Sequence, residues 1–343
     1  MGRARTYYPV AVDVIVGVVA AVLLALASVL FFMCRRRRVA QLADEEGKPF
    51  FRPPLQSFPF GAIDAATDGF NPHRFLRKGR LGTVYMAVAE SGEFLAVKRI
   101  NPHLVLSNAG LSFSSRIRSL SSAYHPNVVP ILGYSEAPGE RILVLEFVGM
   151  KSLDLYLHQD VLDSSSMLLD WGLRLRIAAG AARGIEHLHE GTAPHIVHGS
   201  VKPSNIMIDK YFSARVCDYG LSFLASQETR GLEGYLDGEW GDEEQDVVCK
   251  ASDVYGFGVV LLELLSGRRC EGGSIVEYWA LPLIRSYKLA ELLDPRLRLP
   301  VNMKPLLRLA KVASACVGNS RKSRPSIVQV AAILNNLEMQ PLC

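Results

Sequence analysis

The residues of this chain that could carry chemistry lie in four separate segments. Glycines punctuate residues 76–85, a lysine stands at position 98, and polar residues gather at 196–205 and around Asp218. Glycine-rich turns, lysines, and amide or carboxylate oxygens are the groups that position phosphates and divalent cations during phosphoryl transfer. Each segment is a weak signal by itself. A Gly-x-x-Gly sequence is more often a plain turn, and the alternative for Lys98 is an ordinary surface lysine on a strand.

The elements that must position these segments are strands first and helices later. Residues 75–100 alternate β-branched and apolar residues with glycines, which predicts strands joined by a tight turn. Apolar residues recur at positions 173, 177, 181, 185 and 188, which predicts a helix with one buried face. Residues 254–265 are almost wholly apolar but too few to span a membrane, so they predict a buried helix. This order favours an α+β domain with a small β-rich lobe and a larger helical lobe.

The N-terminus predicts a single membrane-spanning helix over residues 10–34. Asp13 is the only charge in that range, and the 21 residues from 14 to 34 carry none. At about 1.5 Å per residue they cover the hydrocarbon core of about 30 Å. A signal peptide has a shorter apolar region and a small-residue cleavage site, so we favour a true span.

The basic residues after this helix predict its orientation. Arg35, Arg36, Arg37 and Arg38 follow directly, and such a cluster marks the cytosolic side. We expect these arginines to contact anionic lipid headgroups as well. Cys34 could carry a palmitoyl group. Gly2 begins a loose myristoylation pattern, but its modification would require a cytosolic N-terminus, contrary to the arginine cluster.

The remaining composition excludes several classes of protein. The formal net charge is +4, yet residues 53–343 hold 30 basic and 30 acidic residues, so the main body is not expected to bind nucleic acid. The six cysteines are scattered without a CxxC pair, which excludes a disulfide-built scaffold and gives no zinc spacing. We therefore divide the chain into a short extracytosolic segment (1–9), the membrane helix (10–34), a basic juxtamembrane linker (35–57) and one folded domain (58–339).

The order and spacing of the motifs in that domain resemble a protein kinase from end to end. The matching segments are residues 76–85, Lys98, 125–129, 196–205, 218–220 and 252–258. Residues 60–70, and Asp170-Trp171 before the long helix, are similar to plant receptor-like kinases in particular. The resemblance implies a bilobal protein-kinase-like fold, with residues 58–148 as the N-lobe and 149–339 as the C-lobe.

The resemblance also implies a nucleotide site with ATP and Mg²⁺ as cofactors. The residues it assigns to the nucleotide are Gly79, Gly82, Val84, Lys98 and Glu146, with Leu145 lining the back of the pocket. Those it assigns to the metal are Asn205 and Asp218, while Lys202 would contact the γ-phosphate.

Two groups that the chemistry needs are replaced. Ser200 stands where the kinase family has its catalytic aspartate. A serine hydroxyl cannot accept a proton at about pH 7, and residues 193–208 contain no acid that could replace the aspartate. Arg116 stands where the kinase family has the glutamate that pairs with the lysine matching Lys98. Residues 94–135 contain no acid that could take its place. Arg116 would repel Lys98 unless its helix swings outward or an anion lies between them.

Further departures concern the loops around the site. Arg77 replaces the first loop glycine and is expected to crowd or clamp the phosphates, and Gly199 replaces an arginine. Leu232 stands where the family has a threonine, and Asp237-Gly238 where it has Ala-Pro.

Other polar residues of the domain fit an architectural role. We expect Glu239 and Arg324 to form a buried ion pair and Asp253 to hold the catalytic-loop backbone. Ser222, Ser226 and Thr229 are ordinary loop hydroxyls or phosphorylation sites for a partner kinase.

These departures favour a membrane-anchored receptor-like pseudokinase. It would reside in the plasma membrane with a cytosolic kinase-like domain and act as a scaffold or allosteric partner of active receptor-like or cytoplasmic kinases. The alternative is a weakly active Ser/Thr kinase that transfers the ATP γ-phosphate without the usual aspartate. A third reading is a fold that binds no nucleotide, with Arg77 and Arg116 filling the pocket.

Overall fold

The computed structural model describes residues 54–106, 112–149, 151–158, 167–225, 231–237, 248–269 and 276–341. All of them belong to one compact unit, Pro54–Cys343. No helix in this described part of the chain is long and apolar enough to cross a membrane. The span predicted at 10–34 and the arginines at 35–38 lie outside the described residues.

The first lobe is built on one six-stranded sheet. Its strands are β1 (Gln56–Ser57), β2 (Phe75–Lys78), β3 (Gly82–Val88), β4 (Phe94–Ile100), β5 (Ile131–Ala137) and β6 (Glu140–Glu146), in the spatial order β1-β5-β6-β4-β3-β2. Neighbours pair antiparallel except β1, which pairs parallel with β5. Because β1 joins the sheet, the folded unit extends further towards the N-terminus than the predicted boundary at residue 58.

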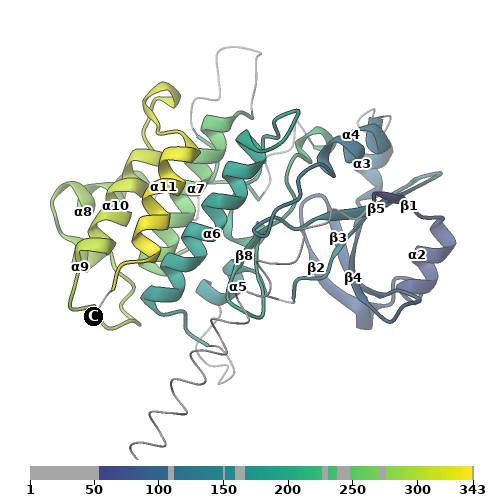
Figure 1. The fold of residues 1–343 in the computed structure, drawn as a ribbon, viewed down its shortest axis with the longest axis horizontal. Helices are drawn as coiled ribbons and strands as arrows, with labels where there is room; N and C mark the ends of the chain where they lie inside the picture. Colours follow the sequence, from purple (N-terminus) through teal and green to yellow (C-terminus); the bar gives the residue numbers. More distant parts are fainter. Residues whose placement is uncertain are drawn as a thin grey trace, which may run out of the picture. The chain divides into compact units, whose positions relative to one another are not determined.

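Three short helices accompany this sheet (Figure 1): α2 (Phe60–Ala66), α3 (Pro102–Leu106) and α4 (Phe113–Leu120). Helix α2 contributes Ile63 to a small apolar cluster with Phe70 and side chains from β3, β4 and β6. Helix α4 buries Phe113, Ile117 and Leu120 in the main core. The strands predicted over residues 75–100 are therefore confirmed as β2, β3 and β4.

The second lobe is mainly helical. It contains α5 (Leu153–His158), α6 (Trp171–Glu190), α7 (Lys250–Ser266), α8 (Leu281–Arg285), α9 (Leu289–Leu292), α10 (Lys304–Cys316) and α11 (Ile327–Glu338), with a small sheet of β7 (Ile206–Ile208) and β8 (Ala214–Val216). Helices α6, α7, α10 and α11 run side by side, with α11 in yellow against α6 (Figure 1).

The long helices of this lobe follow the sequence pattern. Asp170 caps α6, because its carboxylate accepts a hydrogen bond from the Leu173 amide at 2.8 Å. Helix α7 is buried along almost its whole length and ends at Gly267, whose φ of 65° favours glycine. Both predicted helices are confirmed, and together the lobes form the bilobal α+β architecture that positions the site.

Candidate functional site

The residues assigned to the nucleotide converge on the cleft between the lobes. A cavity of about 260 Å³ is lined by Gly79, Gly82, Val84, Lys98, Ser200, Lys202, Asn205 and Asp218. A second cavity of only about 40 Å³ lies against β6 and is lined by Leu145, Glu146, Val84 and Arg77, among others. Arg77 borders both cavities, so it lies where the wide and narrow ends of the cleft meet.

Asp218 is held by two cations. The Lys98 Nζ atom lies 2.6 Å from Asp218 Oδ2, and the Lys98 side chain is 2% exposed. Arg77 Nη2 lies 3.8 Å from the same oxygen. Burial opposes the charged carboxylate, but Lys98 and Arg77 outweigh it and hold the pKa of Asp218 well below its usual value. The lysine and the carboxylate predicted to serve a phosphate and a metal are thus bound to each other.

Arg77 fastens the first lobe to the second. It lies on β2, and its guanidinium donates to the Ser204 carbonyl at 2.9 Å and to Cys217 Sγ at 3.5 Å. Burial raises the pKa of the Cys217 thiol to about 11, so the sulfur stays protonated beside the guanidinium. The Arg77 side chain thus crosses the cleft and binds protein groups; its expected effect on phosphates stays a prediction.

The glycine turn before β3 is closed on itself. The Gly79 amide donates to the Gly82 carbonyl at 2.9 Å, and the Gly82 amide donates back to the Gly79 carbonyl at 3.3 Å. Backbone amides that cradle phosphates must point at the ligand instead. The N–H groups of both glycines are therefore occupied within the turn.

The residues predicted to hold Mg²⁺ and ATP are present but are bound to other protein groups. The cavity beside β6 is narrow, about 40 Å³ next to Arg77, and it adjoins the larger cavity of about 260 Å³. Mg²⁺ in such sites relies on substrate phosphates together with one or two carboxylates. Asp218 Oδ1 is buried without a hydrogen-bond partner, and Asn205 lines the same cavity, so these two residues suit a metal that also binds substrate phosphates.

Ser200 and Asn205 form a closed pair in the catalytic loop. The Asn205 amide nitrogen donates to both the carbonyl and the hydroxyl oxygen of Ser200, each at 2.8 Å. Lys202 donates to the Gly231 carbonyl at 2.6 Å. The acids among the described lining residues are Asp154, which contacts His158 and Arg269, and Asp218, which pairs with Lys98.

The backbone of this loop is nevertheless held firmly. Asp253 accepts hydrogen bonds from the amides of His198 and Gly199, each at 2.7 Å, and contacts His189 Nε2 at 2.8 Å. Gly199 has a φ of 74°, a conformation that suits glycine. Asp253 therefore occupies the architectural position that the sequence suggests for it.

Arg116 does not reach the cavity. It lies on α4, and its guanidinium stacks over the Phe223 ring at 5.6 Å from the centroid. Lys98 instead pairs with Asp218. The third reading placed Arg116 in the pocket, and that placement is wrong, because the guanidinium stacks on the Phe223 ring instead.

Arg324 forms a buried ion pair with Asp237, one of the two residues that replace the family's Ala-Pro. Its Nη1 atom lies 2.5 Å from Asp237 Oδ2, and both side chains are 1% exposed. Arg321 Nε contacts the same oxygen at 2.8 Å. The expected partner, Glu239, lies outside the described residues, as do Ser226 and Thr229. Asp237 stands where the family has the alanine of Ala-Pro. Its negative charge was the signal in the sequence that it could pair with an arginine.

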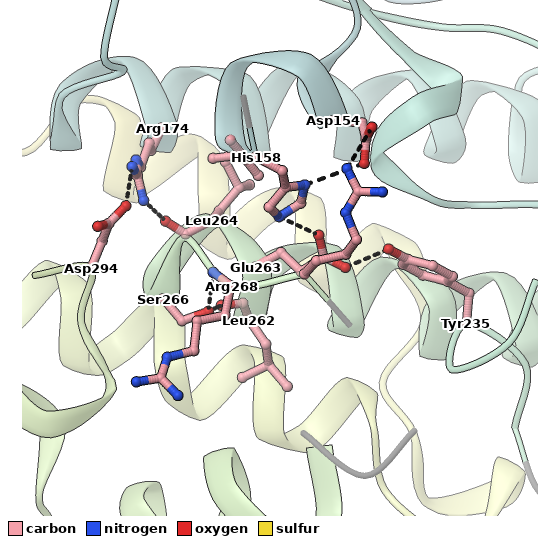
Figure 2. Close-up of polar contacts among 12 residues, drawn as sticks. Asp154, His158, Arg174, Tyr235, Leu262, Glu263, Leu264, Ser266, Arg268 and Asp294 are labelled. Carbon is pink, nitrogen blue, oxygen red and sulfur yellow. Dashed lines mark hydrogen bonds and ion pairs between the residues drawn. The ribbon is translucent and has the colours of Figure 1, made fainter. Parts of the chain in front are cut away.

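A second polar cluster includes Asp154, which also lines the cavity (Figure 2). His158 stands between Asp154, at 3.2 Å, and Glu263, at 3.1 Å, and the Tyr235 hydroxyl donates to Glu263 Oε1. Burial alone would lower the pKa of His158, but its hydrogen bonds to Asp154 and Glu263 raise it to about 9. The sequence analysis missed this cluster, since its members come from α5, α7 and residues 231–237.

Comparison with known proteins places these features in context. A family model described as protein tyrosine and serine/threonine kinase matches residues 70–334. The serine/threonine-protein kinase-like protein CCR2 of Arabidopsis thaliana is 38% identical over 283 residues, which cover 81% of this chain and 34% of that protein. The kinase PBS1 of the same organism is 35% identical over 300 residues, covering 83% of this chain and 64% of PBS1.

Similarity extends to solved structures. The pseudokinase domain of BIR2, described as an immune regulator of the RLK/Pelle family, superposes with a TM-score of 0.69 at 32% identity. The match covers 86% of this chain and 93% of that domain. The chain spans about a third or less of CCR2 and of the receptor-like protein kinase BRI1-like 3.

Proposed function

The chain belongs to the protein tyrosine and serine/threonine kinase family, among the plant receptor-like kinases, and from that premise we propose that it is a pseudokinase. Its kinase-like domain acts by binding other proteins and does not transfer phosphate. The observation that carries this proposal is the ion-pair cluster of Arg77, Lys98 and Asp218, which uses the nucleotide and metal ligands within the fold. Ser200 in place of a base points the same way.

The partners that suit this role are active receptor-like or cytoplasmic kinases. The similarity to BIR2 supports a regulatory role, and the retained fold provides the surfaces for contact with such kinases. We propose further that residues 10–34 anchor the chain in the plasma membrane as a single span, with the kinase-like domain in the cytosol. Arg35–Arg38 would then meet anionic lipids, which their charge supports.

The test measures nucleotide binding and phosphate transfer by the purified chain. We expect no transfer from labelled ATP above background and no stabilisation by Mg·ATP in a thermal-shift titration. Arg77→Ala should open the narrow end of the cleft and introduce nucleotide binding. Arg74→Ala is the matched control, because Arg74 donates to the Ala66 carbonyl away from the cavity.

The outcomes separate the proposal from its rival. Transfer by the unmodified chain at the rate of an active kinase would establish the alternative of an enzyme that works without the aspartate. Arg77 does not block the site if the unmodified chain binds nucleotide as tightly as the Arg77→Ala and Arg74→Ala variants do.

A further inference from the structure

The last part of the chain carries charge of almost one sign. Residues 295–343 contain eight lysines and arginines and a single acid, Glu338, whereas residues 53–294 contain 22 basic and 29 acidic residues. Three of the eight pair with acids within the fold: Arg296, Arg321 and Arg324. The other five are exposed: Arg298, Lys304, Arg308, Lys311 and Lys322. The balanced charge of the whole domain therefore conceals a basic region near its C-terminal end.

Helix α10 aligns three of these exposed cations in a row. Lys304, Arg308 and Lys311 are spaced so that they lie on one face of the helix, and all three are exposed. The other face of α10 is buried in the main core through Leu306, Leu309, Ala310 and Ala313. Helices α8, α9 and α10 lie at the end of the second lobe away from the six-stranded sheet (Figure 1). The row, about 10 Å long at about 1.5 Å per residue, therefore faces solvent at this end of the lobe.

Acids on three other helices of this lobe have partners of their own. Glu338, at the end of α11, lies 2.8 Å from Arg183 Nη1. Glu291 on α9 lies 3.5 Å from Lys288 Nζ, and Asp170 caps α6 through the Leu173 amide. Their charges are balanced or used elsewhere, which leaves the row of cations on α10 with a positive potential towards solvent.

Exposed apolar side chains stand beside the N-terminal end of this row. Leu299 and Val301, in the loop before α10, are 54% and 92% exposed, and Met339, directly after α11, is 85% exposed. Asn302 Nδ2 donates to the Pro341 carbonyl at 3.3 Å, which holds the segment after α11 against this loop. Single apolar residues on a surface need no explanation, but several beside a row of cations form an amphipathic surface.

We propose that this α10 face (Arg298, Val301, Lys304, Arg308, Lys311 and Met339) binds the surface of an anionic membrane. The cations bind lipid headgroups, and the apolar side chains enter the boundary between headgroups and acyl chains. A protein partner is usually held by anchors in pockets, whereas a bilayer needs none, and the cavities at the cleft are lined by other residues. The inference goes beyond the proposed function, because this contact belongs to the folded domain and is separate from residues 10–38.

Acylation of lysines by acetic anhydride tests this face on the purified full chain. The chain is mixed with lipid nanodiscs of phosphatidylcholine, alone or with phosphatidylserine added, and mass spectrometry follows the acylation of each lysine. We expect Lys304 and Lys311 to react at least about fivefold more slowly with the anionic discs present, the effect of about 1 kcal/mol per cation at such a surface. Lys78 on β2 and Lys210 in the β7–β8 turn are exposed and should react equally with both discs. Because one chain is compared on two lipids, the result does not depend on whether residues 10–34 span the membrane.

Two double variants separate this face from the net charge of the chain. Arg298→Gln combined with Arg308→Gln should raise the acylation of Lys304 and Lys311 on anionic discs to the level on neutral discs. Lys78→Gln combined with Lys210→Gln removes the same charge elsewhere and should leave the protection unchanged. The proposal is overturned if Lys304 and Lys311 react equally with both discs, or if the two double variants behave alike.

Soluble poly-glutamate is the probe for an acidic protein partner. If poly-glutamate protects Lys304 and Lys311 and the anionic discs do not, the face binds an acidic protein segment and the membrane proposal is overturned. The phosphate-transfer assay reports on the proposed function separately, so either can fail alone.

Discussion

Replacing Asp218 by asparagine tests whether this carboxylate serves the fold. Asparagine keeps the size of the side chain and removes its charge, which leaves Lys98, 2% exposed, without its partner at 2.6 Å. At an effective dielectric constant of about 20, the gross attraction is about 6 kcal/mol for Lys98, and for Arg77 at 3.8 Å it is about 4 kcal/mol. Desolvation offsets much of this, and breaking one partner of a buried pair typically costs about 3–5 kcal/mol.

We therefore expect Asp218→Asn to lose about 3–5 kcal/mol of unfolding free energy at neutral pH, and to unfold about 6–10 °C lower. Urea unfolding followed by circular dichroism measures the difference. Glu90→Gln is the control, since Glu90 is exposed and should change stability by less than about 0.5 kcal/mol. Because Asp218 has a depressed pKa in the folded state, its contribution is complete above the unfolded pKa of about 3.9 and is lost as the pH falls below it.

A double-mutant cycle with Lys98→Met completes the experiment. The pair should show a coupling energy of about 1–3 kcal/mol, because each single change leaves the other charge buried. The reasoning is refuted if Asp218→Asn costs under about 1 kcal/mol, or if the two changes are additive. Either result would mean that Asp218 is free to hold a ligand.

Three shorter predictions concern the surroundings of the cleft. The pKa of His158 is raised in the folded state, so its stabilising contribution is complete below about pH 6.5 and is lost as the pH rises through about 9. Urea unfolding across this range should show a fall in unfolding free energy that His158→Gln abolishes. An unchanged pH profile in that variant would exclude this role of His158. Asp237→Asn should lower the unfolding free energy by about 3–5 kcal/mol, because it removes the carboxylate that pairs with the buried Arg324. Arg321→Ala should lower it by at most about 1 kcal/mol, because the Arg321 side chain is 23% exposed. Equal losses in denaturant unfolding would contradict this ranking. Ser200→Asp should not restore phosphate transfer in the labelled-ATP assay, because Arg77 still crosses the cleft, and a gain of activity would show that the base alone was missing.

The fold was readily predicted, because its signals are local. The spacing of apolar residues after Asp170 predicts α6, and the structure shows that this aspartate caps the helix. The positions of Lys98 and Asp218 followed from the motifs, and the structure brings both to one cavity.

The contacts that the side chains of the site make with one another could not be predicted from local sequence signals. Arg77 has a long side chain whose destination depends on Ser204 and Cys217, more than a hundred positions away in the sequence. Arg174 presents the same difficulty: it lies on the buried part of α6, and its partner Asp294 at 2.6 Å comes from beyond α9 (Figure 2). Long-range pairs of this kind carry no periodic signal.

The position of Arg77 has a practical consequence for chemical profiling. Inhibitors that imitate adenine need space next to β6, and here the cavity beside β6 measures about 40 Å³ with the Arg77 guanidinium at its border. We therefore expect affinity resins built from such inhibitors to retain this chain poorly. Its abundance in a cell extract should be followed with antibodies or tags.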